Sequence, residues 1–197
     1  NWVSSDNFVG AATAQARILW SADDATLIAP FDRRGANWIA AIPSGGGDAK
    51  ELLGGARVFG LVRLSTGTNR LYYVVSTPTT LADLWTANAD GTGARKLLGV
   101  NDAALEGMKL VSPEKLQAKN GAGDTIDAWL YPPVDFDPKK TYPMILYIHG
   151  GPQEYDGDFF DTGLENQLFP TKGWAVLRAN YRGSTSYGEA FSHAVWA

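Results

Sequence analysis

The apolar positions of residues 16–100 recur in short runs that are separated by polar turn sequences. The runs read ARILW, ATLIAPF, NWIAAI, FGLVRL, RLYYVVS and DLWTA, and the breaks include SADDA, DRRGA, PSGGGD, STGTN and NADGTG. Branched and aromatic residues favour strands, whereas Gly, Asn, Asp and Ser favour tight turns. The pattern therefore predicts a meander of antiparallel hairpins, in which the Gly-rich breaks are turns and not phosphate-binding loops.

This β-rich segment is similar to itself after a shift of 45 residues. The shift places Gly46 on Gly91, Lys50 on Arg95 and the pair Leu52-Leu53 on Leu97-Leu98. A repeat of this length with about four strands is typical of a β-propeller blade. Chance similarity between two hairpins of one β-sandwich remains the alternative. Because two such units cannot close a ring, we expect further blades before residue 1.

The pattern changes after residue 108. A β-hairpin is predicted to turn at Asn120-Gly121, with Ile126, Ala128 and Leu130 alternating on one face. The runs MILYIHG and WAVLRANY are continuously apolar, as expected for parallel strands that are buried on both faces.

A crossover helix is predicted between these two runs. It spans Phe159 to Lys172, and Leu164, Leu168 and Phe169 form its apolar stripe. Strand, helix and strand together make one βαβ unit. The predicted fold is therefore β-propeller blades over residues 1–108, followed by the N-terminal part of an α/β-hydrolase domain over residues 109–197.

Composition narrows the classes of function. The chain has 197 residues, 45% of them hydrophobic, and a net charge of −4 without long runs of one sign, so we expect no nucleic-acid partner. The chain has no cysteine, which excludes disulfides and thiolate chemistry but leaves the compartment undetermined, cytoplasmic or periplasmic. No apolar run reaches the roughly 20 residues of a membrane span, so a soluble protein is expected. The start without Met and the end at FSHAVWA indicate a fragment of a longer polypeptide.

The most informative motif is His149-Gly150-Gly151, directly after the apolar run MILYI. Ligands of open α/β sheets bind beyond the carboxyl ends of the strands. Glycines there leave backbone N–H groups uncovered, so that a substrate oxygen can approach the main chain. The motif therefore predicts part of an oxyanion hole, while a plain strand-to-loop turn is the alternative interpretation.

Two longer segments, YPMILYIHGGPQ and GWAVLRANYRGSTSYGEAF, resemble the prolyl oligopeptidase family of serine peptidases, and most of all its acylaminoacyl-peptidase branch. The resemblance covers residues 141–193 closely and residues 1–108 loosely. It implies hydrolysis of short peptides by a Ser-Asp-His triad, with a propeller that restricts access. It also implies that the triad lies beyond Ala197, so that this chain alone is inactive.

The resemblance assigns roles to individual residues. The N–H of Gly151 is the candidate oxyanion donor, Gly150 gives the loop its conformation, and His149 lies where relatives place an aromatic residue or a histidine. Residues 180–188 are expected to brace the site, and Arg182 is a second candidate, for a substrate carboxylate. No cofactor or metal is implied. The expected partners are short peptides and the remainder of the polypeptide, and oligomerisation is left open.

Several residues imitate catalytic groups without matching their context. Ser186 lacks the G-x-S-x-G elbow of a nucleophile, and His193 is expected to be a surface or packing residue. Glu154, Asp156, Asp158 and Asp161 are expected to form a solvated loop, in which Asp161 caps the helix. Tryptophans 20, 38 and 85 are expected to pack between sheets.

Two other functions remain open. A carboxylesterase can use the same oxyanion loop, although such enzymes usually have helical caps and no propeller. A propeller binding protein with a degenerate hydrolase domain would lack the serine elbow.

Overall fold

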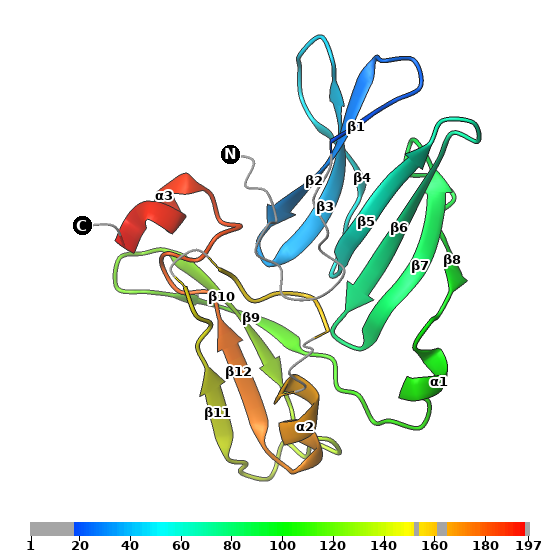
Figure 1. Cartoon of the computed structure of the whole chain (residues 1–197). Helices are drawn as coiled ribbons and strands as arrows, with labels where there is room; N and C mark the ends of the chain where they lie inside the picture. Colours follow the sequence, from blue (N-terminus) through cyan, green and yellow to red (C-terminus); the bar gives the residue numbers. More distant parts are fainter. Residues whose placement is uncertain (1–17, 152–153, 161–164, 196–197) are drawn as a thin grey trace.

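The computed structural model describes residues 18–151, 154–160 and 165–195 of the chain. These residues form three four-stranded sheets (Figure 1). The first sheet consists of β1 (Leu19–Trp20), β2 (Thr26–Arg33), β3 (Ala36–Pro43) and β4 (Lys50–Leu53). The second consists of β5 (Val58–Ser65), β6 (Arg70–Thr77), β7 (Thr80–Asn88) and β8 (Arg95–Leu98).

Both of these sheets are antiparallel meanders, in which each strand pairs with the next one along the chain. The predicted hairpins are therefore confirmed. The last strands of the two sheets begin at Lys50 and Arg95, the pair that the 45-residue shift aligns. The sheets share one apolar core, to which Ile28, Ile39, Phe59, Val62, Leu71, Tyr73, Val75 and Ala87 contribute. Each sheet thus buries its apolar face partly against the other.

The third sheet is mixed and has the order β11-β12-β10-β9. Its strands are β9 (Glu114–Lys119), β10 (Thr125–Tyr131), β11 (Met144–Tyr147) and β12 (Ala175–Ala179), and a short helix α1 (Asp102–Leu105) precedes them. The β9–β10 hairpin turns at Asn120-Gly121 as predicted, closed by a hydrogen bond from Asn120 N to Asp124 O of 3.1 Å. β11 and β12 pair in parallel, and α2 (Glu165–Thr171) lies between them in sequence.

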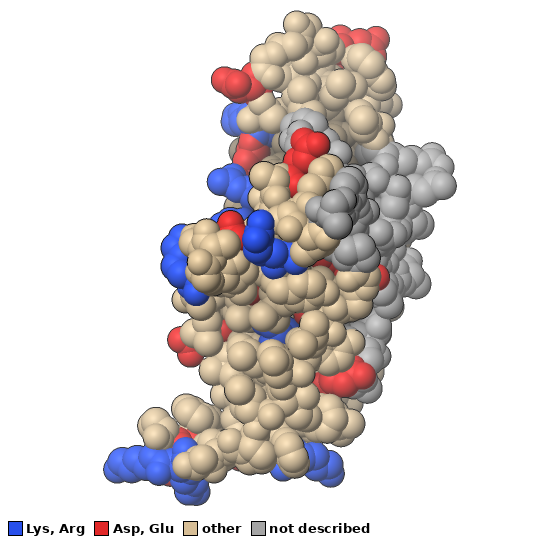
Figure 2. Space-filling model, turned by 90° about the vertical axis from the view of Figure 1, so that its left-hand side faces the viewer, with Lys and Arg blue, Asp and Glu red and all other residues tan. Residues whose placement is uncertain are grey.

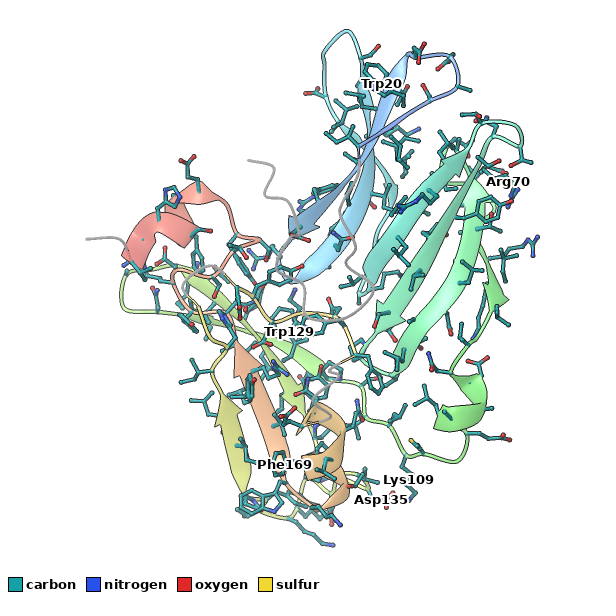
Figure 3. All side chains as sticks on the ribbon, in the orientation of Figure 1. Trp20, Arg70, Lys109, Trp129, Asp135 and Phe169 are labelled. Atoms are coloured by element: carbon teal, nitrogen blue, oxygen red, sulfur yellow. The ribbon has the colours of Figure 1, made fainter. Side chains whose placement is uncertain are left out.

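Trp129 and Tyr131 of β10 and Val176 of β12 form a small apolar core on one face of this sheet, and Phe169 of α2 packs against it (Figure 3). The predicted alternation of β10 is present. The more deeply buried face, however, carries Asp127, Trp129 and Tyr131, while Ile126, Ala128 and Leu130 are half-buried on the other face.

The predicted burial of two elements is wrong. β11 is the edge strand of its sheet and most of its side chains are exposed, because no described element covers it. In α2, Leu168 is 51% exposed, whereas Asn166, Gln167 and Pro170 are buried. Gln167 faces inward because its amide bonds both backbone groups of Val111. Leu164 lies outside the described residues.

The tryptophan prediction holds only in part. Trp85 packs against the shared core and Trp38 is half-buried, but Trp20 is 53% exposed at the far end of the first sheet (Figure 3). Charges of both signs are scattered over the face shown in Figure 2. Among the described residues, no helix has the length and apolar character that a membrane span requires.

Candidate active-site loop

The loop that follows β11 begins with a buried histidine. His149 is only 6% exposed, although Ile148 before it and the two glycines after it face solvent. Its Nδ1 lies 3.0 Å from the carbonyl oxygen of Gly150. Because a carbonyl only accepts, we place the ring proton on Nδ1. Nε2 then accepts a hydrogen bond from the hydroxyl of Ser184 at 2.8 Å.

Tyr181 contacts both the ring of His149 and the backbone carbonyl groups of the loop. Its ring stacks on His149, with ring centroids 4.5 Å apart. Its hydroxyl donates to the carbonyl oxygen of His149 at 2.8 Å and lies 3.4 Å from that of Gly151. Burial, with the charges of Glu154 and Asp156, raises the pKa of Tyr181, so the hydroxyl keeps the proton that it donates.

The backbone amides of Gly150 and Gly151 are the candidate donors of the loop. Among the described residues, the N–H groups of Gly150 and Gly151 donate to no protein acceptor. Gly151 has a φ of 67°, a left-handed conformation that favours glycine. The loop therefore places bare N–H groups at the carboxyl end of β11, where a ligand could accept from them.

The segment after β12 forms a brace around this loop. Asn180 also belongs to this brace and is fully buried. Its side chain accepts from Asp156 N at 2.7 Å and donates to Asp156 O at 2.8 Å. The N–H of Thr185 donates to Glu154 O at 3.0 Å. These contacts agree with the bracing role expected for residues 180–188.

The prediction of a solvated acidic loop is wrong for two of its residues. Asp156 is buried and pairs with Arg178 of β12. Asp158 is buried and accepts a hydrogen bond of 2.9 Å from Trp129 Nε1. Both carboxylates are buried because long-range partners replace their water. Asp161 lies outside the described residues.

The residues that imitate catalytic groups have structural partners. The Ser186 hydroxyl accepts from Gly35 N at 3.0 Å. His193 is exposed and lies 3.7 Å from Glu189 in the helix α3 (Glu189–Ser192), just before the 3-10 turn η1 (His193–Val195). Arg182 is also exposed, and its Nε lies 3.2 Å from Asp124 Oδ2, so it is near the β9–β10 turn.

Sequence reasoning missed the individual roles of Tyr181 and Ser184. The segment NYRGS directly after an apolar run was the available indication. It does not tell which side chains turn toward His149, because that choice depends on the loop's path in space. Within the described ranges, no group of three His, Asp or Glu residues could hold a metal ion.

No family model matches the chain. The chain is 37% identical over 106 residues to the uncharacterized peptidase YuxL of Bacillus subtilis, covering 53% of this chain and 16% of that protein. It is 30% identical over 184 residues to dipeptidyl-peptidase 5 of Aspergillus oryzae, covering 88% of this chain and 24% of the relative.

Solved structures show the same relationship. An acylaminoacyl peptidase from Pyrococcus horikoshii has a TM-score of 0.76 and 25% identity, over 92% of this chain and 27% of that chain. Dipeptidyl peptidase 4 of Porphyromonas gingivalis has a TM-score of 0.70 and 19% identity, over 94% of this chain and 27% of that chain, and shows likeness of fold alone.

These relatives and structural neighbours are all named as peptidases. Together they support a peptidase of the prolyl oligopeptidase family, which the HGGP and NYRGS segments predicted. The chain spans only 24% of dipeptidyl-peptidase 5 and 27% of the acylaminoacyl peptidase.

Proposed function

We propose that the intact protein is a serine peptidase that hydrolyses short peptides, in the manner of an acylaminoacyl peptidase or a dipeptidyl peptidase. Its Ser-Asp-His triad is supplied by a part of the polypeptide outside this chain. Residues 109–197 form the start of the α/β-hydrolase domain and contribute the oxyanion loop His149–Gly151. The peptide substrate is the partner that this function requires.

The observation that carries this proposal is a pair of backbone amides without a protein acceptor, directly after a histidine that two side chains hold in place. The N–H groups of Gly150 and Gly151 have no acceptor among the described residues, while Tyr181 and Ser184 fix the His149 that precedes them. An oxyanion hole needs donors that are held in place before negative charge develops on the carbonyl oxygen. The brace around His149 supports the assignment of these backbone N–H groups as such donors.

The chemical role follows from the charge of the intermediate. When a serine attacks a peptide carbonyl, the oxygen becomes an oxyanion, and a fixed N–H group lowers the energy of that state more than that of the substrate. One such donor is worth about 3 kcal/mol of activation free energy, or about 10² in rate. We assign this role to the Gly151 N–H, and Gly150 gives the loop its conformation.

The first two sheets support a propeller assignment for residues 1–108. Each is a four-stranded antiparallel meander, and their last strands begin at positions related by the 45-residue shift. Repeats of this kind bury their faces against neighbouring repeats, as the shared core of these sheets does. In the proposed enzyme these blades restrict access to the site.

Covalent labelling of the full-length protein by a fluorophosphonate probe tests the proposal. Such a probe reacts with an activated serine, so we expect stoichiometric labelling of the folded protein and none of residues 1–197 alone. Hydrolysis of acyl-peptide p-nitroanilides should accompany it. Turnover of p-nitrophenyl esters alone would instead favour a carboxylesterase, and a folded protein that stays unlabelled would favour a non-catalytic propeller protein.

A further inference from the structure

The tip of the β2–β3 hairpin consists of Arg34 and Gly35. All four backbone N–H and C=O groups of these two residues form hydrogen bonds with residues of the segment 109–195. The Arg34 N–H donates to Ser186 O at 2.8 Å, and Arg34 O accepts from Lys115 Nζ at 2.7 Å. The Gly35 N–H donates to Ser186 Oγ at 3.0 Å, and Gly35 O accepts from Asp158 N at 2.9 Å. A hairpin tip in water would leave these groups to solvent, so this turn is docked.

The turn has the local geometry for this docking. Arg33 pairs with Ala36, which leaves a two-residue loop, and Arg34 and Gly35 have φ values of 52° and 76°. Two positive φ values define the tight hairpin turn that matches strand twist. A Cβ on Gly35 would lie 2.3 Å from the ring of Trp129, which lies on β10 where the third sheet faces the first two (Figure 3).

The Arg34 side chain adds a charged contact. Its Nη2 lies 2.6 Å from Asp127 Oδ1, and the Asp127 side chain is fully buried. The same carboxylate accepts from Gln117 Nε2 at 2.8 Å and from the Tyr187 hydroxyl at 3.0 Å. One buried carboxylate thus joins the turn, strand β9 and the brace segment 180–188.

The partners of the turn are the segments that adjoin the candidate oxyanion loop. Ser186 belongs to the brace, in which Ser184 holds His149. Tyr155 lies four residues after Gly151, and its hydroxyl donates to Asp32 Oδ1 of β2, the strand that leads into the turn, at 3.0 Å. The turn therefore contacts the segment that follows the loop, through Asp158, and the brace that holds His149, through Ser186.

We propose that the β2–β3 turn is a positioning element for the His149–Gly151 loop and that Arg34 is its positioning residue. The inference rests on the proposed function, because it assigns the turn a role in holding oxyanion donors. Donor geometry is sensitive, and a displacement of about 1 Å in a catalytic site can cost 10²-fold in rate. A contact that only packs two sheets together would affect stability and leave turnover unchanged.

Steady-state kinetics of the full-length protein test this role. In the variant Arg34→Asn, the new residue tolerates the positive φ but lacks the guanidinium. We expect kcat to fall about tenfold while KM stays within about twofold, since a donor acts on the transition state. Arg34→Lys should recover part of kcat, because its ammonium keeps a positive charge opposite Asp127. The exposed neighbour offers the matched control Arg33→Asn, which should keep wild-type kcat.

The possible results distinguish a failure of the positioning role from a failure of the proposed peptidase function. An active, labelled wild-type protein with unchanged kcat in Arg34→Asn would overturn the positioning role alone. An unreactive wild-type protein would overturn the proposed function and this inference together. If Arg34→Asn does not fold, Ser186→Ala removes only the hydroxyl acceptor of the Gly35 N–H. A wild-type kcat in Ser186→Ala would then overturn the positioning role, and a lowered kcat with unchanged KM supports it.

Discussion

His149 Nε2 and Ser184 Oγ lie 2.8 Å apart and are both buried, although they are 35 residues apart in the chain. The contact joins the loop after β11 to the segment after β12. Since β11 and β12 are parallel neighbours, their carboxyl ends meet at one edge of the sheet. The pairing of these strands thus brings together two residues whose side chains fix the candidate oxyanion loop.

Removing the Ser184 hydroxyl should destabilise the fold. In Ser184→Ala, Nε2 of His149 becomes a buried acceptor without its donor, at a cost of about 1–3 kcal/mol in the free energy of unfolding. Urea unfolding of the full-length protein, followed by tryptophan fluorescence, measures it. Ser44→Ala, at an exposed turn serine, is the control and should be near neutral. Equal midpoints for the two variants would contradict the prediction.

The Gly151 donor can be removed without a change of side chain. Proline cannot adopt the φ of 67° at this position, so Gly151→Pro would distort the loop as well as delete the N–H. Glycolic acid, incorporated at position 151 by nonsense suppression, replaces the N–H by an ester oxygen. We expect kcat to fall by about 10² to 10³ with the fold retained.

The same ester at Gly121, in the exposed β9–β10 turn, is the control for this experiment and should leave kcat unchanged. Wild-type kcat for the ester at position 151 would show that the oxyanion donor lies elsewhere.

Close backbone packing between the first sheet and the loop segment predicts a steric effect. A Cβ on Gly157 would lie 1.9 Å from Gly35 O, whereas a Cβ on Gly121 would meet nothing within 4 Å. Gly157→Ala should therefore destabilise the protein by about 1–3 kcal/mol, the usual cost of overpacking. Gly121→Ala should leave the midpoint of thermal unfolding unchanged. A Gly157→Ala protein as stable as wild type would mean that the two backbones separate readily.

Asp127 should make stability depend on pH. Burial raises the pKa of Asp127, but the hydrogen bond from Gln117, the charge of Lys115 and bonds from Tyr187 and Arg34 outweigh it, so its pKa lies below the usual value. A depressed folded-state pKa contributes stability above the unfolded value of about 3.9, and this contribution is lost as pH falls through the folded-state pKa. The stability gap between wild type and Asp127→Asn should therefore narrow in acid.

Asp158 should give stability the opposite dependence on pH, and the same experiment measures it. Its burial, only partly offset by the Trp129 hydrogen bond, raises the pKa of Asp158. A raised folded-state pKa lowers stability as pH rises through the range between the two values. The stability of Asp158→Asn relative to wild type should consequently increase with pH. Urea midpoints between about pH 3 and pH 8 measure both variants, and parallel curves would contradict the assignment.

Arg182 remains the second candidate for substrate binding. If its guanidinium binds a peptide carboxylate, Arg182→Ala should raise KM for substrates with a free carboxyl terminus and leave KM for the amidated forms unchanged. Its exposed pair with Asp124 should contribute less than about 1 kcal/mol to stability, because solvent screens such pairs. Equal KM values with both substrate forms would remove Arg182 from the site.

The local structure of this protein could be predicted from the amino-acid sequence. Turn residues between β-rich runs predicted the hairpins of the first two sheets, and Asn120-Gly121 predicted the β9–β10 turn. His149-Gly150-Gly151 after an apolar strand indicated the candidate loop. These features could be predicted because turn chemistry and strand propensity act over a few neighbouring residues.

The burial of polar groups and the contacts that hold the loop became known from the three-dimensional structure. Asp156 and Asp158 looked solvated in sequence, but Arg178 and Trp129 replace their water. Gln167 takes the inward place expected for an apolar residue because it bonds the backbone of Val111. Burial and hydrogen bonding depend on partners far apart in the chain, and local sequence patterns carry no record of which distant groups will meet.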